Sequence, residues 1–473
     1  MKVLIHNTID RAKETLEPKG SEFKMYCCGP TVYGPAHIGN FRTFLVQDAL
    51  RRTLEASGVK VKHVRNITDV DDKTIRESRK LGITLKEFTQ KWTDKFHADC
   101  KKLNMLAPTV EPKATEHIGE QIKMVKALVD KGHAYAMPDG SVYFKISSFP
   151  EYGKLSGLDT SSLSTQSENS AGSANLADEY ERDSVSDFAL WKGKKPEDGE
   201  NSWKSPWGEG RPGWHIECSA MSAKYLGPSF DLHGGGIDLC FPHHENEIAQ
   251  SECASGVKPY VRYWFHSAHL MVEGKKMSKS LGNLYTLDDL EGKGYTPMQV
   301  RLALLMGHYR QQLNFTFKGL DDAKSALAKL DKLAASMLEK IPLTQKQFCD
   351  ILEKRDFGEE EGAFIPAYNA MCDDINVPKA MGEAFTAFQK LEKPALQDAK
   401  SYARFLYCVG IVPFETLEKQ VVDVPENVRE LAQKRWDAKK AKDFALADSL
   451  RKEISALGWG VLDKKDGFEI VKE

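Results

Sequence analysis

The chain has 473 residues, too many for one ordinary hydrophobic core, so we expect two to four domains. Hydrophobic residues make up 41% and charged residues 28%, as in soluble globular proteins, and no apolar run approaches the roughly 20 residues that span a bilayer. The nine cysteines are scattered, which indicates reduced thiols. A formal net charge of −2 does not by itself indicate a nucleic-acid-binding protein. Residues 1–6 lack a secretory signal, which predicts a cytoplasmic location.

The first part of the chain has an α/β pattern. Residues 23–28 have strand character, a helix is predicted from near His37 to about Ser57, and residues 59–67 read as the next strand. This order predicts a parallel sheet that binds phosphates where its strands end and the helix begins. Further on, Thr84 and Glu87 have the spacing of a capping box at the start of a helix-rich stretch.

The rest of the chain is divided into recognisable stretches. Residues 141–146 predict a strand in a different module, and the Ser-, Asn- and Gly-rich residues 156–177 predict a mobile surface loop. A strand at 230–233 precedes three glycines and a helix that Pro242 is expected to open. Helices dominate after residue 280, with one apolar stripe formed by Leu320, Ala323, Leu327, Leu330 and Ala334.

The last stretch of the chain predicts a separate small module. Residues 421–425 read as a linker, followed by two short helices and a hairpin of residues 460–462 and 468–471. The second helix is predicted to carry one apolar face, made of Leu446, Leu450, Ile454 and Leu457.

Two short runs point to phosphate chemistry. Residues 276–280 read Lys-Met-Ser-Lys-Ser between Gly274 and Gly282, so two ammonium groups stand on a loop that can close on a polyphosphate. Far upstream, residues 37–40 read His-Ile-Gly-Asn, a turn that can bring a backbone and an imidazole close to the same phosphates. Either run alone is better explained as an ordinary loop or turn; their joint presence, in this order, favours function.

A metal site is a third possibility. His243 and Glu247 are four residues apart, a common half-site for zinc. Thiolates would have to come from separate segments, with Cys27 or Cys28 and Cys218 as the candidates. The alternative is that these are ordinary surface or core side chains.

The two phosphate-binding runs resemble the signatures of class I aminoacyl-tRNA synthetases. Residues 28–33, 213–220 and 241–247 resemble the zinc-bearing segments of the cysteinyl-tRNA synthetase family. The resemblance implies a Rossmann-like parallel-sheet catalytic core with an inserted connective module, then an α-helical bundle and a small α+β anticodon-binding domain. The implied parts are residues 1–135 and 206–318 for the two halves of the catalytic domain, 136–205 for the insertion, 319–420 for the bundle and 426–473 for the terminal domain.

The resemblance also assigns site residues. It implies one zinc ion on Cys28, Cys218, His243 and Glu247, with Cys27, His244 and Glu245 as neighbours. Cysteine would be bound by Thr68, Trp214 and His233. Catalysis would fall to His37, Asn40, Lys276 and Lys279, and ATP binding to His37, Asn40, Gly234, Gly235, Gly236, Asp238 and Lys279. Asn40 stands where the family motif usually has histidine, so the resemblance does not establish how much Asn40 contributes to catalysis.

The implied reaction is that of a cysteine–tRNA ligase. L-cysteine and ATP, with Mg²⁺, give cysteinyl-adenylate and pyrophosphate, and cysteine then passes to the terminal adenosine of tRNA(Cys). Arg435, Trp459 and Asp463 are the expected tRNA contacts, because charge and aromatic rings suit splayed bases. The family expectation is a monomer.

Two other functions share parts of this pattern. A ligase that joins cysteine to a small amine, as in mycothiol synthesis, would use the same adenylate chemistry. The module after Pro425 argues against it, because a small acceptor needs no such module. A non-catalytic, zinc-containing RNA-binding protein would not need the lysine loop.

Overall fold

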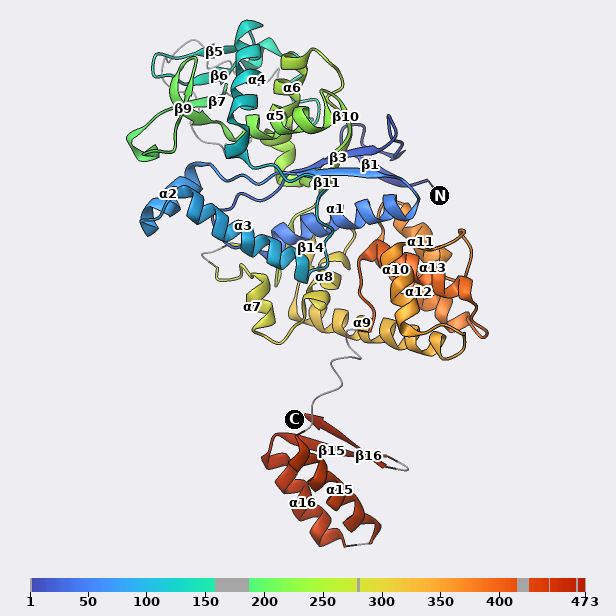
Figure 1. Ribbon diagram of the computed structural model, residues 1–473. Helices are drawn as coiled ribbons and strands as arrows, with labels where there is room; N and C mark the ends of the chain where they lie inside the picture. The colour runs from blue at the N-terminus through green and yellow to red at the C-terminus, as the bar shows by residue number, and fades with distance from the viewer. Residues whose placement is uncertain are drawn as a thin grey trace. The chain divides into compact units, whose positions relative to one another are not determined.

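The computed structural model describes residues 2–157, 187–278, 281–414, 425–441, 443–464 and 467–472. It has two compact units, Met1–Val412 and Pro413–Glu473 (Figure 1). Most of the predicted Ser-rich loop, most of the predicted linker and Lys279 lie outside the described residues. The finer division of the chain into five parts stays a prediction.

The centre of the first unit is a sheet of four parallel strands in the order β11-β10-β3-β4. These strands are β3 (Phe23–Cys27), β4 (Val61–Arg65), β10 (Phe230–Gly236) and β11 (Val261–Ser267). The chain passes from β3 to β4 on one side and returns as β10 on the other side of β3. The direction of winding therefore changes between β3 and β10, which is where open parallel sheets bind ligands.

Helix α1 (Ile38–Ala56) follows β3 and packs along the sheet (Figure 1). Its apolar side chains Phe41, Leu45 and Ala49 recur at helical spacing and are buried, which holds the helix against the strands. The predicted strand and helix are confirmed here. The second predicted strand is shorter than expected, since β4 covers only Val61–Arg65.

A five-stranded antiparallel sheet, order β5-β6-β7-β9-β8, is inserted between the halves of the parallel sheet (Figure 1). Its strands are β5 (Ala134–Ala136), β6 (Val142–Phe144), β7 (Phe188–Gly193), β8 (Trp203–Ser205) and β9 (Gly208–Pro212). The strand predicted at residues 141–146 is confirmed as β6. Helices α4 (Ile118–Asp130), α5 (Trp214–Leu226) and α6 (Glu245–Ser255) pack together beside this insertion.

Helix α6 begins later than the sequence predicted. Residues 240–244 form a separate π-helical turn in which Phe241 has extended backbone angles, so the regular helix begins at Glu245 and not at Pro242. His243 and Glu247 still meet, because His243 in the turn lies directly over the first turn of α6: their Nε2 and Oε1 atoms are 3.1 Å apart.

Two helices, α2 (Asp72–Leu81) and α3 (Leu85–Lys102), follow β4. The predicted capping box at Thr84 is confirmed: Thr84 Oγ1 accepts from the Glu87 amide, and Glu87 accepts from the Thr84 amide. Helix α2 is tied to the insertion by an ion cluster. Asp72 accepts from Lys192 at 2.8 Å and from Arg211, and Arg211 also pairs with Asp198.

We expect Asp72→Asn to destabilise the first unit. Lys192 and Arg211 are buried, so removal of the carboxylate leaves their positive charges without this partner. Because Asp72 is half exposed, the loss of unfolding free energy should be only about 1–2 kcal/mol. Burial alone would raise the pKa of Asp72, but Lys192 and Arg211 lower it to about 2. The stabilisation is therefore present above about pH 4. Thermal unfolding should show the two proteins converging as the pH falls towards 2.

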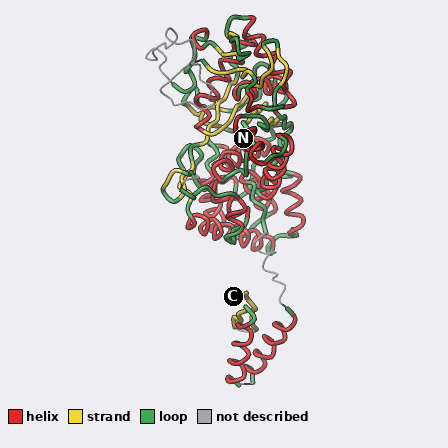
Figure 2. The backbone as a smooth tube through the Cα atoms, turned by 90° about the vertical axis from the view of Figure 1, so that its left-hand side faces the viewer, coloured by secondary structure: helices red, strands yellow, loops and turns green. Residues whose placement is uncertain are grey.

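The chain after β11 is mainly helical (Figure 2). Strands β12 (Leu270–Val272), β13 (Lys275–Lys276) and β14 (Leu313–Phe315) form a small sheet with helices α7 (Leu287–Glu291) and α8 (Pro297–Leu305). Helices α9 (Phe317–Leu338), α10 (Gln345–Lys354), α11 (Ile365–Cys372), α12 (Val377–Lys390) and α13 (Leu396–Val409) follow. All five residues of the predicted apolar stripe on α9 are buried, as expected.

The second unit contains helices α15 (Glu426–Lys440) and α16 (Phe444–Ala456) and the hairpin of β15 (Trp459–Lys464) and β16 (Gly467–Lys472). The predicted helices and hairpin are confirmed. The predicted apolar face of α16 is only half right, because Leu450 and Ile454 are buried whereas Leu446 is 49% exposed and Leu457 is 46% exposed. Leu457 follows the last residue of α16, and Leu446 lies in its first turn, so neither belongs to the buried core of the unit.

The fold has three further features. Strands β1 (Leu4–Asn7) and β2 (Ala12–Thr15) form an antiparallel hairpin, in which β1 contacts β11. Across the ranges described above, no helix has the length and apolar character to span a bilayer. All nine cysteines are free thiols.

Candidate metal centre and nucleotide site

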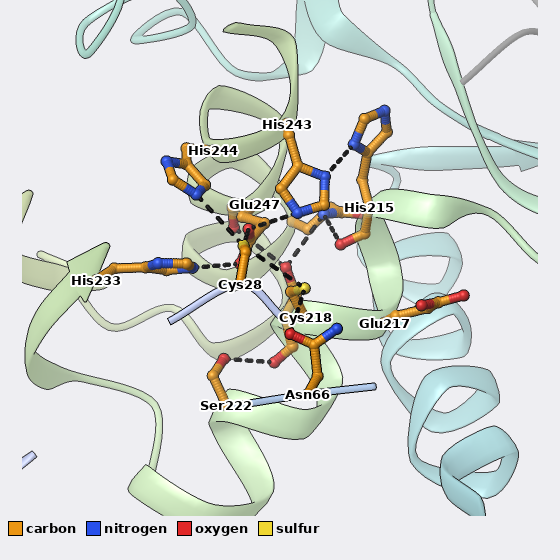
Figure 3. Close-up of polar contacts among 12 residues, drawn as sticks. Cys28, Asn66, His215, Glu217, Cys218, Ser222, His233, His243, His244 and Glu247 are labelled. Carbon is orange, nitrogen blue, oxygen red and sulfur yellow. Dashed lines mark hydrogen bonds and ion pairs between the residues drawn. The ribbon is translucent and has the colours of Figure 1, made fainter. Parts of the chain in front are cut away.

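Four side chains from three separate segments converge where β3 ends (Figure 3). The ligand atoms of Cys28, Cys218, His243 and Glu247 all lie within 4.8 Å of one another, and all four side chains are buried. The two Sγ atoms are 4.0 Å apart, and Cys28 Sγ lies 3.9 Å from Glu247 Oε1. Tetrahedral bonds of about 2.0–2.3 Å to a zinc-sized ion would place ligand atoms roughly 3.3–3.8 Å apart. The cluster therefore has the size and the donors of a metal site with four protein ligands.

The side chains of the cluster shift one another's pKa values. A hydrogen bond from Cys28 and the neighbouring His243 lower the pKa of the Cys218 thiol to about 6, although burial opposes them. Burial alone would raise the pKa of Glu247, but His233 and His243 lower it to about 2. Burial alone would lower the pKa of His243, but Glu247 and Cys218 raise it to about 10. These side chains therefore favour a positive charge between them. Without a metal ion, protonated His243 carries that charge.

A second set of four side chains overlaps the first. Cys28 and Glu247 also lie close to His233 and His244, whose ligand atoms meet the same distance limit. His244 Nε2 is 3.4 Å from Cys28 Sγ, and His233 Nε2 is 2.9 Å from Glu247 Oε2. The pocket can therefore present either one or two thiols to an ion.

The outer nitrogens of these histidines distinguish the two sets. A histidine that binds a metal almost always has its other ring nitrogen in a hydrogen bond. His243 meets this condition, because its Nδ1 shares a hydrogen bond of 2.8 Å with His215 Nδ1. In the second set, His244 also meets it, because its Nδ1 shares a hydrogen bond of 2.8 Å with His266 Nε2. His233 does not, because its Nδ1 finds no hydrogen-bond partner in the described part of the chain. The set with two thiols is favoured.

The three predicted cysteine-binding residues surround this cluster. His233 contacts Glu247 directly, and the Trp214 ring lies 4.5 Å from the His243 ring, measured between centroids. Thr68 reaches the cluster through its neighbours. Its hydroxyl accepts a hydrogen bond from Asn66 at 3.1 Å and donates one to Glu217 at 2.9 Å. All three are thus brought to one pocket.

Three residues of this pocket were not predicted from the sequence. Asn66 accepts from the Gly29 amide at 2.9 Å and so links the ends of β3 and β4. His215 orients His243, and Glu217 is fully buried with its carboxylate turned away from the thiols (Figure 3). His215 and Glu217 adjoin Trp214 and Cys218 in sequence, which was the only available signal for them.

Gly29 is required by the close approach of two strand ends. A Cβ at this position would lie 1.7 Å from the carbonyl oxygen of Asn66. We expect Gly29→Ala to push Cys28 out of the cluster and to weaken metal binding at least roughly tenfold, about 1.4 kcal/mol. Gly34→Ala is the matched control, since its Cβ would meet nothing within 4 Å in the described chain. Equal metal content in both variants would contradict this reading.

The predicted phosphate-binding turn forms the N-terminus of α1. His37 is the N-cap: its Nδ1 accepts from the Asn40 amide at 3.3 Å, and the Asn40 side-chain oxygen accepts from the His37 amide at 3.1 Å. This reciprocal capping gives a structural reason for asparagine at position 40, because its amide oxygen satisfies a backbone donor of the first turn. The helix N-terminus is also favourable for anions.

The lysine loop starts beside this turn. Lys276 is exposed at the end of β13, while the Met277 side chain packs close to Gly39. After the loop, the Tyr285 carbonyl accepts from the Ile38 amide at 2.9 Å. Both ends of the loop therefore lie at the His37 turn. Lys279 lies outside the described residues, so its position is not part of this geometry.

The three glycines predicted to contact ATP form the end of β10, which extends further than the sequence suggested. A Cβ on Gly235 would lie 2.8 Å from the His244 ring, and one on Gly236 would lie 2.3 Å from Asp238 Oδ1. Asp238 itself is exposed. All three glycines are buried, and the absence of side chains lets this strand end pack closely against His244, Asp238 and Thr43 of α1.

The predicted tRNA contacts lie together in the second unit. Arg435 is buried and donates to both carboxylate oxygens of Asp463, at 2.8 and 3.0 Å, and Lys439 pairs with the same carboxylate. These hydrogen bonds lower the pKa of Asp463. Trp459 is buried in the core of the unit, so its ring does not offer a surface for base stacking. Phe444, 60% exposed at the start of α16, does.

The fold of the first unit has known relatives. Methionyl-tRNA synthetase of Mycobacterium tuberculosis, in complex with methionyl-adenylate, superposes with a TM-score of 0.56 at 13% identity, covering 82% of this chain and 89% of that one. The ternary complex of Agrobacterium radiobacter K84 LeuRS with tRNA and LeuAMS also gives 0.56, at 14% identity, covering 83% of this chain and 84% of that one. Residues 15–325 match the family model of the tRNA synthetases class I (C) catalytic domain. The fold and the site together define a class I tRNA synthetase.

Relatives of high similarity extend over the whole chain. A cysteine–tRNA ligase of Opitutus terrae is 52% identical, and the match covers 99% of each chain. A cysteine–tRNA ligase of Chlamydia muridarum is 42% identical over 100% of both chains. This chain belongs to the cysteine–tRNA ligase family.

Proposed function

We propose that the protein activates L-cysteine with ATP and transfers it to the terminal adenosine of tRNA(Cys). The observation that carries the proposal is the convergence of Cys28, Cys218, His243 and Glu247 in one buried cluster beside the N-terminus of α1. Relatives of this family match the chain from end to end, including the second unit, which favours a tRNA acceptor over a small amine.

The metal is proposed to be zinc. Two thiols, one imidazole and one carboxylate are donors that suit zinc, whereas magnesium prefers oxygen ligands alone. An ion held there would supply a Lewis acid for the substrate thiolate, which it would favour over a neutral hydroxyl. Cys28, Cys218, His243 and Glu247 would hold the ion, and His215 would orient His243 through the 2.8 Å hydrogen bond.

Coordination explains how cysteine is distinguished from serine. The two amino acids differ in one atom, and a difference of that size in a packed pocket gives only about 1–3 kcal/mol. A discrimination of about 10⁵-fold requires roughly 7 kcal/mol, which metal–thiolate bonding can supply and packing cannot. Trp214, His233 and Thr68 would shape the remainder of the amino-acid pocket.

The nucleotide would lie across the ends of β3 and β10. His37 and Asn40 would face the phosphates from the N-terminus of α1, and the backbone of Gly234–Gly236 would approach the adenosine, with Asp238 at the edge. Lys276 and Lys279 are proposed to stabilise charge on the departing pyrophosphate, together with Mg²⁺ on ATP. This chemistry consists of positioning and charge stabilisation and needs no covalent catalyst.

The second unit is proposed to bind the anticodon. Asp463 is held in one orientation by Arg435 and Lys439, and a fixed carboxylate can accept hydrogen bonds from an unpaired base. Exposed Phe444 offers an apolar ring in the same unit, while Trp459 supports the core. The five-part domain division, a monomeric state and a cytoplasmic location belong to the same proposal.

Two assays test the function in sequence. Cysteine-dependent exchange between ATP and labelled pyrophosphate should occur without tRNA, and tRNA(Cys) should then become charged. Exchange without charging, but with transfer to a small amine, would favour the rival ligase. The absence of any cysteine-dependent exchange would overturn the proposal.

A further inference from the structure

Helix α2 carries an exposed basic surface whose position suggests a role in binding RNA. We propose that Lys73, Arg76 and Lys80, the α2 basic stripe, bind the phosphate backbone of the tRNA acceptor arm, and that Leu81 and Ile83, the apolar tip, contact its bases. The inference rests on the proposed function, because it requires a tRNA substrate. It adds a docking surface outside the metal and nucleotide site.

The stripe occupies one face of the helix. Its members are spaced three and four residues apart, so their side chains project from the same side. The opposite face is buried through Thr74, Ile75 and Ser78. Arg76 and Lys80 have side chains 59% and 60% exposed.

The charge of this surface is unbalanced. Residues 73–80 contain four cations, Lys73, Arg76, Arg79 and Lys80, but only one carboxylate, Glu77. Asp71, the N-cap of the helix, interacts with Lys73, which is partly buried, so the excess lies towards Arg76 and Lys80. Glu77 pairs with Arg76 at 3.0 Å and with Lys80 at 2.8 Å, and it cannot neutralise both. Asp72 does not help, because Lys192 and Arg211 already hold it. In a protein of net charge −2, such a local excess of positive charge suits a polyanion.

The inner end of the stripe lies at the amino-acid pocket. The Lys73 ammonium is 5.5 Å from the centre of the Tyr33 ring, and the neighbouring Thr31 is bridged to Thr68. From this end the 10 residues of α2 extend outward by about 15 Å. An RNA strand whose 3′ end reaches the pocket therefore has a path along the stripe.

The stripe is also held rigidly. At its start, Asp72 is fixed by the buried cations of the insertion, and near its end Arg79 donates to the Glu197 carbonyl of the same insertion. A surface with a fixed position relative to the pocket can set the direction in which an RNA end enters.

The tip adds an apolar contact. Leu81 is 60% exposed and Ile83 is 39% exposed, although single exposed hydrophobics at a turn are common and need no explanation. Two such side chains within three residues, directly after a basic stripe, match the apolar wedges that nucleic-acid-binding proteins insert beside bases.

The test is the double variant Arg76→Gln/Lys80→Gln in tRNA charging and in tRNA-independent pyrophosphate exchange. At about 0.1 M salt, we expect KM for tRNA to rise roughly tenfold, and the dependence of log(1/KM) on log[salt] to become shallower by about 2, one for each lost phosphate contact. Cysteine-dependent exchange should stay within about twofold of the wild type. Leu81→Ser/Ile83→Ser should raise KM about threefold with the salt dependence unchanged.

The matched control is Lys346→Gln/Lys354→Gln on α10, which also removes two exposed cations but on the other side of the first unit (Figure 1). Its KM for tRNA should equal that of the wild type. The inference is overturned if Arg76→Gln/Lys80→Gln leaves KM and the salt dependence unchanged, or if exchange falls together with charging. Failure of the proposed function would look different, since the wild type itself would then lack cysteine-dependent exchange.

Discussion

Replacement of Cys218 by serine is expected to release the metal and abolish cysteine activation together. Cys218 Sγ lies 4.0 Å from Cys28 Sγ inside the buried cluster, and a neutral hydroxyl is a poor zinc ligand. The cysteine thiolate would then lose its partner in the pocket. A fall of at least about 10³-fold in kcat/KM for cysteine corresponds to about 4 kcal/mol. Metal analysis of the purified variant and pyrophosphate exchange measure the two effects.

Two further variants make this prediction specific. Cys253→Ser is the matched control, because Cys253 is a buried cysteine on α6 that belongs to neither candidate ligand set. His244→Asn distinguishes the sets, since only the set with one thiol requires His244. Metal retained in Cys218→Ser but lost in His244→Asn would assign the site to Cys28, His233, His244 and Glu247 instead.

Arg301→Met is expected to produce the largest loss of stability. Arg301 is fully buried in α8, where it donates to Asp48 of α1 at 2.6 Å and to the carbonyl oxygens of Leu103 and Val409. It thus joins helix α1 to the end of α13. Burial lowers the pKa of Arg301 to about 10, which leaves it charged at neutral pH. Methionine fills the space but leaves Asp48 with Arg52 as its remaining cation and the Leu106 amide as its other donor, which should cost about 3–5 kcal/mol of unfolding free energy.

Arg355→Met provides the comparison. Arg355 also pairs with a carboxylate on α1, Glu55, but its side chain is 49% exposed, so its removal should cost no more than about 1 kcal/mol. Urea unfolding of both variants at pH 7 compares the two losses of stability. Equal losses would refute the structural role assigned to Arg301.

The stabilisation by Arg301 should depend on pH. Burial alone would raise the pKa of Asp48, but Arg52 and Arg301 lower it to about 2. The difference between wild type and Arg301→Met should therefore shrink as the pH falls from about 4 towards 2.

The sequence predicted those elements whose signals are local. The helix at residues 38–56, the capping box at Thr84 and the stripe on α9 each follow from periodicity or from a cap. Local signals failed where backbone geometry departs from the regular pattern. Residues 240–244 form a π-helical turn, so the regular helix α6 begins at Glu245, although Pro242 is a usual first residue of a helix.

The site was predictable only through its resemblance to a known family. Spacing alone left Cys27 and Cys28 as equal candidates, whereas the structure places Cys28 in the cluster and Cys27 in the core beneath it. The contacts of Asn66 with Cys218 and of Glu217 with Thr68 join segments about 150 residues apart, and His215 contacts His243, 28 residues further on. No pattern within one segment reveals them. In the same way, burial of Trp459 depends on how the terminal hairpin packs on α15 and α16.

The most direct test of the account is X-ray absorption at the zinc edge of the purified protein, before and after addition of cysteine. Coordination by Cys28, Cys218, His243 and Glu247 predicts two sulfur ligands in the free protein and three with cysteine bound, and no change with serine. An unchanged sulfur count on addition of cysteine would contradict the claim that the metal selects the substrate by binding its thiolate.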